Sequence, residues 1–166
     1  MADLDGFVTA LAAPEQPRSA FAALEALAGE ILGHKLFTLM TVDPAAGLAR
    51  RAWSSQPAAY PVSGAKPLED NDWSRAVLVR HETWVMNSAQ HIAQVFPDRA
   101  LIASLGCESC MNLPIVVGGQ VLGTINCLHV AGHFTPARIA AAEALRLPGA
   151  AAFLLAARLD RQKDTP

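Results

Sequence analysis

The sequence has few charged residues and no cluster of one sign. Charged residues make up 17% of its 166 residues, the formal net charge is -2, and Lys and Arg occur singly. Nucleic-acid binding is therefore not expected, because a phosphate backbone is held by grouped cations. Apolar residues make up 52% of the chain, which is typical of one globular domain with a well-buried core and not of a disordered chain.

Export signals and long apolar runs are also missing. Asp3 and Asp5 lie where a secretory signal carries positive charge. No uninterrupted apolar run approaches the roughly 18 residues of a membrane span. We therefore expect a cytoplasmic protein that makes no membrane contact and keeps its three cysteines reduced.

Motifs of the common enzyme classes are absent as well. The chain has no Gly-rich phosphate loop. None of its five histidines has a Ser or Asp at the spacing of a catalytic triad, and no pair of carboxylates stands in a recognisable frame. The motifs alone therefore assign no enzymatic activity.

The hydrophobic pattern predicts helices and strands in alternation. The expected elements are helices at 3–13 and 19–32, strands at 36–42 and 48–54, a helix at 73–80, a strand at 84–87, a helix at 99–105, a hairpin around Gly118-Gly119, and a helix from 136 to about 159 interrupted at Pro148-Gly149. Residues 60–72 are expected to form a long loop, with Asp72 capping the helix after it. Hairpins at both ends of the chain favour an antiparallel sheet.

The hairpin LPIVVGGQVLGTINCLH, residues 113–129, is apolar on both faces, so both faces should be covered. A two-residue turn at Gly118-Gly119 pairs Val117 with Gln120. Without a bulge, Asn112 then faces Ile125, and Asn112 and Asn126 lie on opposite faces. The same register pairs Cys110 with Cys127 at the short limit of disulfide geometry. We favour the alternative that both are small buried hydrophobic residues.

Four stretches carry a resemblance to a known family. The motifs are NLPIVVGGQVLGTINCLH and FTPARIAAAEAL, preceded by LFTLMTVD and LARRAWSS. They resemble a GAF domain, of the small stand-alone kind found in bacteria, over residues from about 19 to 159. The resemblance implies an α+β fold with an antiparallel sheet of about six strands between helices. The first and last helices should cover one side and a small-molecule pocket the other.

The resemblance also implies an organisation and a role. We expect a helical arm at 1–17, a GAF-like domain at 18–160 and a polar tail at 161–166. The expected function is a sensor or regulatory domain in signal transduction that binds an unidentified small molecule and forms a homodimer through its terminal helices. A ligand-free dimerisation module remains an alternative. The sequence identifies no cofactor and no downstream partner.

Six residues are candidates for lining the pocket. Four are aromatic and come from the first hairpin or the irregular middle, and two are polar or thiol-bearing: Trp53, Tyr60, Trp73, Trp84, Asn126 and Cys107. Aromatic walls with a few fixed polar groups are typical of small-ligand sites, although any single tryptophan could simply fill the core. Asn126 lies deep in an apolar strand and must be hydrogen-bonded, either to a ligand or lid or to neighbouring backbone.

A thiol-based redox activity is the second hypothesis. One branch of the family, the free methionine sulfoxide reductases, uses a nucleophilic cysteine before the middle helix and paired aspartates on a later strand. Here SGAKPLEDNDW contains no cysteine, and Asn126 and Leu128 stand where the aspartates would be. These departures argue against that chemistry, although Cys107 could still be redox-active. Cys107, Cys110 and Cys127 are too few for a zinc site, so no metal is expected.

Overall fold

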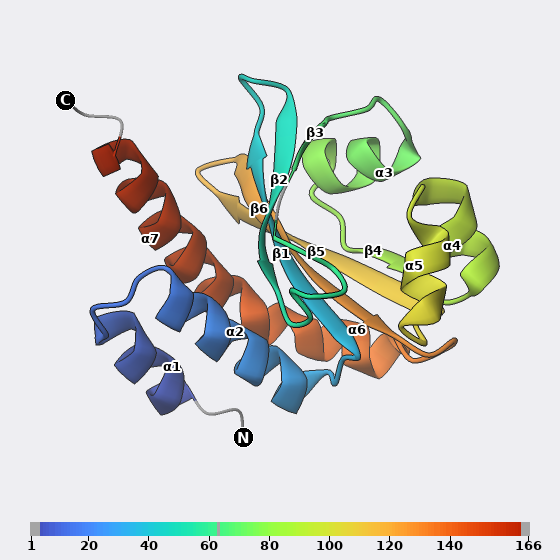
Figure 1. The fold of residues 1–166 in the computed structure, drawn as a ribbon, viewed down its shortest axis with the longest axis horizontal. Coiled ribbons are helices and arrows are strands. Elements are labelled where there is room, and N and C mark those ends of the chain that lie inside the picture. The colour runs from blue at the N-terminus through green and yellow to red at the C-terminus, as the bar shows by residue number, and fades with distance from the viewer. Residues whose placement is uncertain (1–3, 63, 164–166) are drawn as a thin grey trace.

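A six-stranded antiparallel sheet forms the centre of the protein. The computed structural model describes residues 4–62 and 64–163 (Figure 1). The strand order is β3-β2-β1-β6-β5-β4. The strands are β1 (Leu36–Asp43), β2 (Leu48–Ser54), β3 (Ala65–Pro67), β4 (Trp84–Met86), β5 (Ser109–Val117) and β6 (Gln120–His129). The predicted α+β fold is confirmed, and the short β3 lies in the segment that was expected to be only a loop.

Helices cover the two faces of the sheet in different ways. On one side lie α1 (Leu4–Ala12), α2 (Arg18–Ile31), α6 (Pro136–Ala142) and α7 (Arg146–Lys163), with a 3₁₀ turn at Glu143–Leu145 between the last two (Figure 1). On the other lie α3 (Asp72–Ser74), which continues as a π-helical turn at Arg75–Val79, then α4 (Ala89–Val95) and α5 (Arg99–Ser104). The long first and last helices thus share one side, as expected.

The long-helix side holds the main hydrophobic core. Phe21 and Leu24 of α2, Phe37 and Leu39 of β1, and Phe153 of α7 are buried in one cluster. A Cβ at Gly123 of β6 would meet the carbonyl oxygen of Met40 and would lie 2.5 Å from the Phe153 ring. Glycine at this position therefore allows α7 to approach the sheet closely.

The predicted break at Pro148-Gly149 is wrong. Helix α7 runs through both residues, and the irregular turn comes earlier, at Glu143–Leu145. Pro148 lies in the first turn of α7, where a backbone N–H has no helical partner to lose. A Cβ at Gly149 would lie 2.8 Å from Cδ1 of Ile115, so this glycine is a contact position against the sheet.

The C-terminal helical segment is long and strongly apolar. Pro136–Gln162 is long and apolar enough to cross a membrane by length and composition alone, a test that core helices also pass. In this structure Ala142, Leu145, Phe153 and Ala156 are buried in the main core. The segment therefore serves as a core helix of the domain.

A β-bulge changes the expected register of the second hairpin. Gly118 and Gly119 have positive φ angles of 59° and 77°, and Val117 pairs with Gln120 as predicted. Val116 pairs with Val121 but Ile115 pairs with Gly123, which leaves Leu122 without a partner on β5. Every pair beyond the bulge is displaced by one residue.

The shift corrects two predictions about faces. Asn112 pairs with Asn126, not with Ile125, so the two amides share one face of the sheet. Cys110 pairs with Leu128 and lies on the face opposite Cys127. A Cys110–Cys127 disulfide is therefore excluded, and both are buried free thiols.

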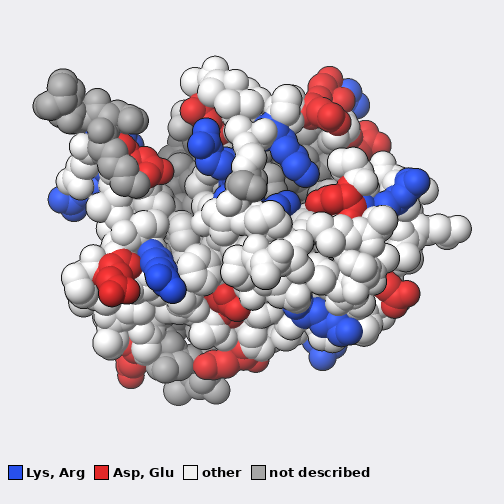
Figure 2. Space-filling model, viewed as in Figure 1, with Lys and Arg blue, Asp and Glu red and all other residues white. Residues whose placement is uncertain are grey.

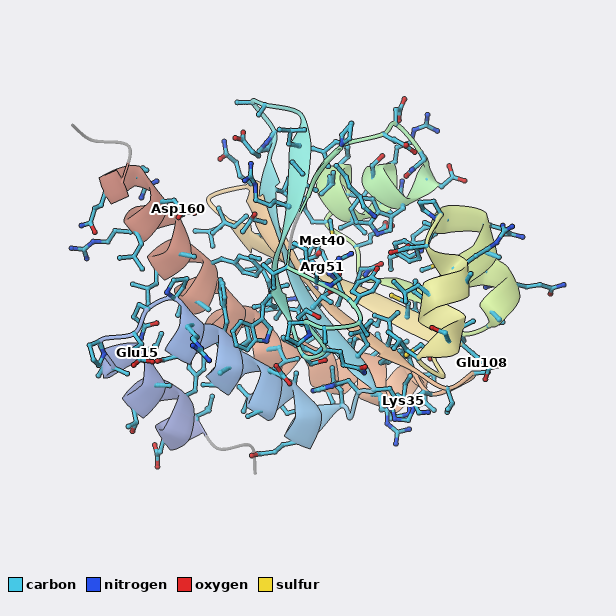
Figure 3. The ribbon with its side chains drawn as sticks, in the orientation of Figure 1. Glu15, Lys35, Met40, Arg51, Glu108 and Asp160 are labelled. Carbon is cyan, nitrogen blue, oxygen red and sulfur yellow. The ribbon has the colours of Figure 1, made fainter. Side chains whose placement is uncertain are left out.

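A second bulge lies in the first hairpin. Leu39 pairs with Trp53 but Met40 pairs with Arg51, which leaves Ala52 without a partner on β1. Arg51 and Trp53 consequently point to opposite faces, although strict alternation would place them on the same one. Figure 3 shows Arg51 beside Met40 in the middle of the molecule.

Candidate functional site

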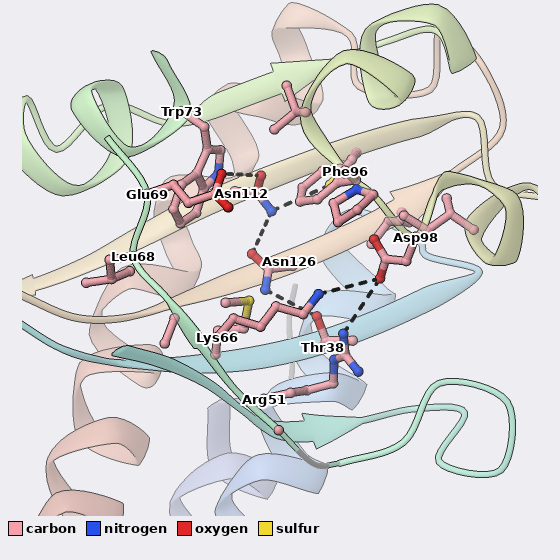
Figure 4. Close-up of a pocket in the computed structure, with 18 of the residues that line it drawn as sticks. Thr38, Arg51, Lys66, Leu68, Glu69, Trp73, Phe96, Asp98, Asn112 and Asn126 are labelled. Atoms are coloured by element: carbon pink, nitrogen blue, oxygen red, sulfur yellow. Dashed lines mark hydrogen bonds and ion pairs between the residues drawn. The ribbon is translucent and has the colours of Figure 1, made fainter. Parts of the chain in front are cut away.

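The short-helix side of the sheet encloses a cavity of about 300 Å³ (Figure 4). Its floor is the sheet, and its walls are β3, the segment leading to α3, and the α4–α5 connection. The lining residues are Thr38, Met40, Ala49, Arg51, Tyr60, Gly64, Lys66, Pro67, Leu68, Glu69, Asn71, Trp73, Val95, Phe96, Pro97, Asp98, Ile102, Cys110, Asn112, Asn126 and Leu128. Mostly apolar walls with a few polar groups are typical of small-molecule sites.

A row of polar side chains crosses the cavity floor. Trp73 Nε1 donates to Asn112 Oδ1 at 3.0 Å, and Asn112 Nδ2 donates to Asn126 Oδ1 at 2.6 Å. Asn126 Nδ2 donates in turn to Thr38 Oγ1 at 3.2 Å. We call these four residues the amide ladder (Figure 4). The amide of Asn126 is therefore satisfied by side chains of the two neighbouring strands.

The first turn of α3 fixes the position of Trp73. Asn71 is the N-cap, and its side chain accepts from the backbone N–H of Ser74 at 2.9 Å. The Ser74 hydroxyl accepts from the Asn71 N–H at 3.0 Å, which completes a capping box. Asp72 was predicted to be the cap and is instead the first helical residue, because Asn71 precedes it with a side chain of the same reach.

Charged groups meet at the other end of the cavity. Asp98 is the residue before α5, and its side chain makes no capping bond to the helix. Its Oδ2 accepts a hydrogen bond from the hydroxyl of Tyr60. Arg51 Nη2 lies 3.9 Å and Lys66 Nζ 4.0 Å from the same oxygen. The Arg51 guanidinium lies 3.7 Å from the centre of the Tyr60 ring, in a cation–π contact. Burial and the bond to Asp98 raise the pKa of Tyr60, so Tyr60 keeps its proton and remains a donor.

Two buried atoms at this end have no hydrogen-bond partner among the described residues. They are Nε of Arg51 and Oδ1 of Asp98. A buried polar group without a partner costs about 1–3 kcal/mol, and more when it is charged. The charged end therefore contains one donor and one acceptor that the described residues leave unpaired.

The structure brings together three of the six predicted pocket residues. Tyr60, Trp73 and Asn126 line the cavity. Trp84 lines an adjoining hollow that shares Trp73 with it, and its buried Nε1 has no partner among the described residues. Cys107 is buried in a second hydrophobic cluster, which is smaller than the main core, and it does not line the cavity.

Trp53 lies on the opposite side of the sheet. It packs edge-on against Phe21 with ring centres 6.2 Å apart, and its Nε1 donates to Glu25 Oε2 at 2.6 Å. The bulge at Ala52 is the reason, since it turns Trp53 toward the long helices. The prediction of Trp53 as a pocket residue is therefore wrong for this cavity.

Several lining residues were missed from the sequence. Arg51, Lys66, Asp98, Asn112 and Thr38 all reach the cavity. The pattern gave no signal for Arg51 and Asn112, because an unrecognised bulge sets the face of each. A charged residue after Pro97 in the irregular middle was a usable signal for Asp98, since polar groups in long loops are often functional.

The thiols show little of the character of a redox site. Burial raises the pKa of Cys127 to about 12 and also raises the pKa of Cys110 and Cys107. A nucleophilic cysteine needs the reverse, a lowered pKa and access to solvent. Among residues 4–62 and 64–163, no group of three or more His, Cys, Asp or Glu could hold a metal ion.

The surface in Figure 2 carries acidic and basic side chains intermixed, without a broad patch of either sign. This distribution agrees with the low net charge of the chain. The face in this view shows no extended basic track of the kind that binds a phosphate backbone.

Comparisons with known proteins agree with this architecture. The sequence model of the GAF domain matches residues 18–146. Similar solved structures are the GAF domains of phosphoenolpyruvate-protein phosphotransferases from Coxiella burnetii (18% identity, TM-score 0.69, covering 96% of this chain and 94% of that one) and from Acinetobacter (11%, 0.69, 95% and 94%). Another is the GAF domain of a two-component sensor histidine kinase from Bacillus halodurans, with 12% identity and a TM-score of 0.66, which covers 82% of this chain and 92% of that one. Identities this low concern the fold alone. No curated protein matches the chain.

Proposed function

The chain belongs to the GAF domain family, and from this premise we propose that it is a regulatory domain that binds a small molecule in the cavity beneath α3. The observation that carries the proposal is the pair of buried atoms without partners among the described residues, Arg51 Nε and Asp98 Oδ1, at one end of a mostly apolar cavity. Both atoms belong to mainly buried side chains, which are 13% and 21% exposed.

The amide ladder gives the bound molecule a connection to the rest of the domain. Trp73 is the member of the ladder that lies on α3, above the cavity. The other three members lie on β5, β6 and β1. A ligand that displaces or orders Trp73 changes a hydrogen bond that continues through the centre of the sheet. Such a connection supports a sensing role, as does the place of a similar domain in the sensor histidine kinase.

The exposed side of α7 supports a homodimer as part of the same proposal. Leu147 and Leu154 are two turns apart on one helix and are 80% and 46% exposed. Large apolar side chains at this spacing form a stripe that a second copy of the helix can cover. Sedimentation of the wild-type protein beside Leu147→Glu tests this part. A wild-type dimer that the variant dissociates supports it, and a wild-type monomer contradicts it.

Native mass spectrometry of the purified protein tests the main proposal. We expect the native mass to exceed the denatured mass by one small molecule per chain, or a small molecule added from a metabolite mixture to raise the unfolding temperature. Ala49 is buried on the cavity wall, so Ala49→Leu should fill part of the space and abolish either effect. Ala45→Leu, at an exposed position in the β1–β2 turn, is the matched control. Binding that survives Ala49→Leu unchanged would place the ligand elsewhere and refute the proposal.

A further inference from the structure

The guanidinium of Arg51 is held in place, but not all of its N–H groups donate a hydrogen bond. Its Nη1 donates to the carbonyl oxygen of Pro61 at 2.9 Å, and its plane lies over the Tyr60 ring. Its Nη2 is 3.9 Å from Asp98 Oδ2, beyond hydrogen-bond distance, and Nε has no partner among the described residues. A fixed guanidinium with unused N–H groups is suited to a planar anion such as a carboxylate.

Only one oxygen of the Asp98 carboxylate, Oδ2, makes polar contacts with the described residues. Oδ2 accepts from Tyr60 and lies within 4.0 Å of both Arg51 and Lys66. Oδ1 is buried and has no donor within the described part of the chain. The site therefore needs a donor for Oδ1 close to an acceptor for Arg51.

The charges at this end favour an acid. Arg51 and Lys66 contribute two positive charges and Asp98 one negative charge, which leaves a net charge of +1. Glu69, the other carboxylate on the lining, lies beside Trp73 at the opposite end of the cavity (Figure 4). Lys66 is 57% exposed, so solvent weakens its contribution, and Arg51 carries most of the attraction.

The rest of the cavity is suited to an apolar side chain. Met40, Phe96, Ile102 and Leu128 also line the cavity. Its volume of about 300 Å³ is at the lower limit of ligand sites. The occupant is thus a molecule of about the size of an amino acid.

From these contacts, and resting on the proposed function, we propose that the ligand is a small carboxylic acid with a hydrogen-bond donor on the adjacent carbon and an apolar side chain. Its carboxylate accepts from Arg51 and Lys66, and its donor bonds to Oδ1 of Asp98. This chemistry is shared by α-amino acids, whose donor is an ammonium, and α-hydroxy acids, whose donor is a hydroxyl.

A matched ligand series on the wild-type protein tests this proposal by calorimetry. The probes are L-phenylalanine, 3-phenyllactate, 3-phenylpropanoate, which lacks the donor, and 3-phenylpropane-1,2-diol, which lacks the carboxylate. The corresponding series on the leucine skeleton covers a smaller side chain. We expect L-phenylalanine or 3-phenyllactate, or its leucine counterpart, to bind about tenfold or more tightly than either truncated analogue, because each removed group leaves a charged partner unpaired. The better of the two identifies the donor as ammonium or hydroxyl.

Two substitutions assign the contacts. Asp98→Asn and Arg51→Gln should each weaken binding of the preferred acid by about 10- to 100-fold. Asp98→Asn should also bring the preferred acid close to the affinity of the donor-free 3-phenylpropanoate, an effect that a general loss of folding does not produce. Asp5→Asn and Arg18→Gln, at exposed positions on α1 and α2, are the matched controls and should leave binding unchanged.

The possible failures separate this inference from the proposed function. Equal affinity for 3-phenylpropanoate and for the donor-bearing acids would refute the proposed ligand class. If neither series binds but the purified protein carries another molecule that Ala49→Leu removes, the ligand class is wrong and the proposed function stands. If neither series binds and the native mass and the metabolite mixture also give no ligand, both proposals fall.

Discussion

The two faces of one sheet differ in how their side chains are satisfied. On the long-helix face, Phe37, Leu39 and Phe153 pack into a continuous apolar core. On the other face lie the amide ladder and the charged end of a cavity. The first face packs apolar side chains against one another, whereas the second leaves Arg51 Nε and Asp98 Oδ1 without partners among the described residues. The contrast supports the proposal that one face provides stability and the other provides the binding site.

The largest expected effect comes from a comparison of one phenylalanine from each face. Phe153 is 2% exposed in the main core, so Phe153→Ala should lower the free energy of unfolding by about 3–5 kcal/mol. Phe96 is half-buried beside the cavity, so Phe96→Ala should cost less than about half as much but should weaken ligand binding. Urea unfolding measures both variants. Equal losses of stability would show that the two faces are packed alike.

The amide ladder should behave as a coupled unit. Asn112→Ala leaves Asn126 Oδ1 and Trp73 Nε1 without their partner, and the expected loss of stability is about 1–3 kcal/mol. The Asn112→Ala/Asn126→Ala double variant should cost less than the sum of the single variants by about 0.5 kcal/mol or more, because the shared bond is lost only once. A double-mutant cycle in urea measures the difference. Strictly additive losses would mean that the ladder bonds contribute nothing as a network.

The exclusion of water from Cys127 on the long-helix face can be tested by the pH dependence of stability. Burial raises the pKa of Cys127 from an ordinary value of 9.0 to about 12. The stabilisation is complete below pH 9 and is lost as the pH rises toward 12, since the unfolded chain releases the thiol proton before the folded one does. Over this window Cys127 should contribute a decline of about 1.4 kcal/mol per pH unit.

Cys127→Ala isolates that contribution. Tyr60, Cys107 and Cys110 also have raised pKa values, so both proteins should lose stability as the pH rises. The wild-type protein should lose it faster, because it alone has the Cys127 thiol. The measured quantity is the difference in slope between the two proteins from pH 9 to 10, not the stability of either one. Parallel slopes would mean that water reaches Cys127.

The sequence predicted the elements better than it predicted the faces. Local pattern and turn chemistry predict the long strands, the positive φ angles of Gly118 and Gly119, and the residue range of α2. The face of a residue depends on every residue between it and the turn, so one bulge reverses it. The bulges at Ala52 and Leu122 account for the misplacement of Trp53 and of Asn112.

The charged end of the site depended on contacts that no local pattern encodes. Arg51, Lys66 and Asp98 come from β2, β3 and the start of α5, and only the fold brings them within 4.0 Å. Tyr60, Trp73 and Asn126 could be predicted because an aromatic residue in a long loop and an amide in an apolar strand are unusual wherever they occur.

The most direct test of the two-face account uses the three tryptophan indoles as probes. Each indole N–H gives its own signal in a ¹H–¹⁵N NMR spectrum, and Trp53→Phe, Trp73→Phe and Trp84→Phe assign them. On titration with the tightest-binding acid, or with the molecule carried through purification, the account predicts that the Trp73 signal shifts, because its N–H belongs to the amide ladder at the cavity. Trp53, bonded to Glu25 on the long-helix face, should remain in place. A shift of Trp53 as large as that of Trp73, or a shift of Trp53 alone, would contradict the assignment of binding to the cavity face.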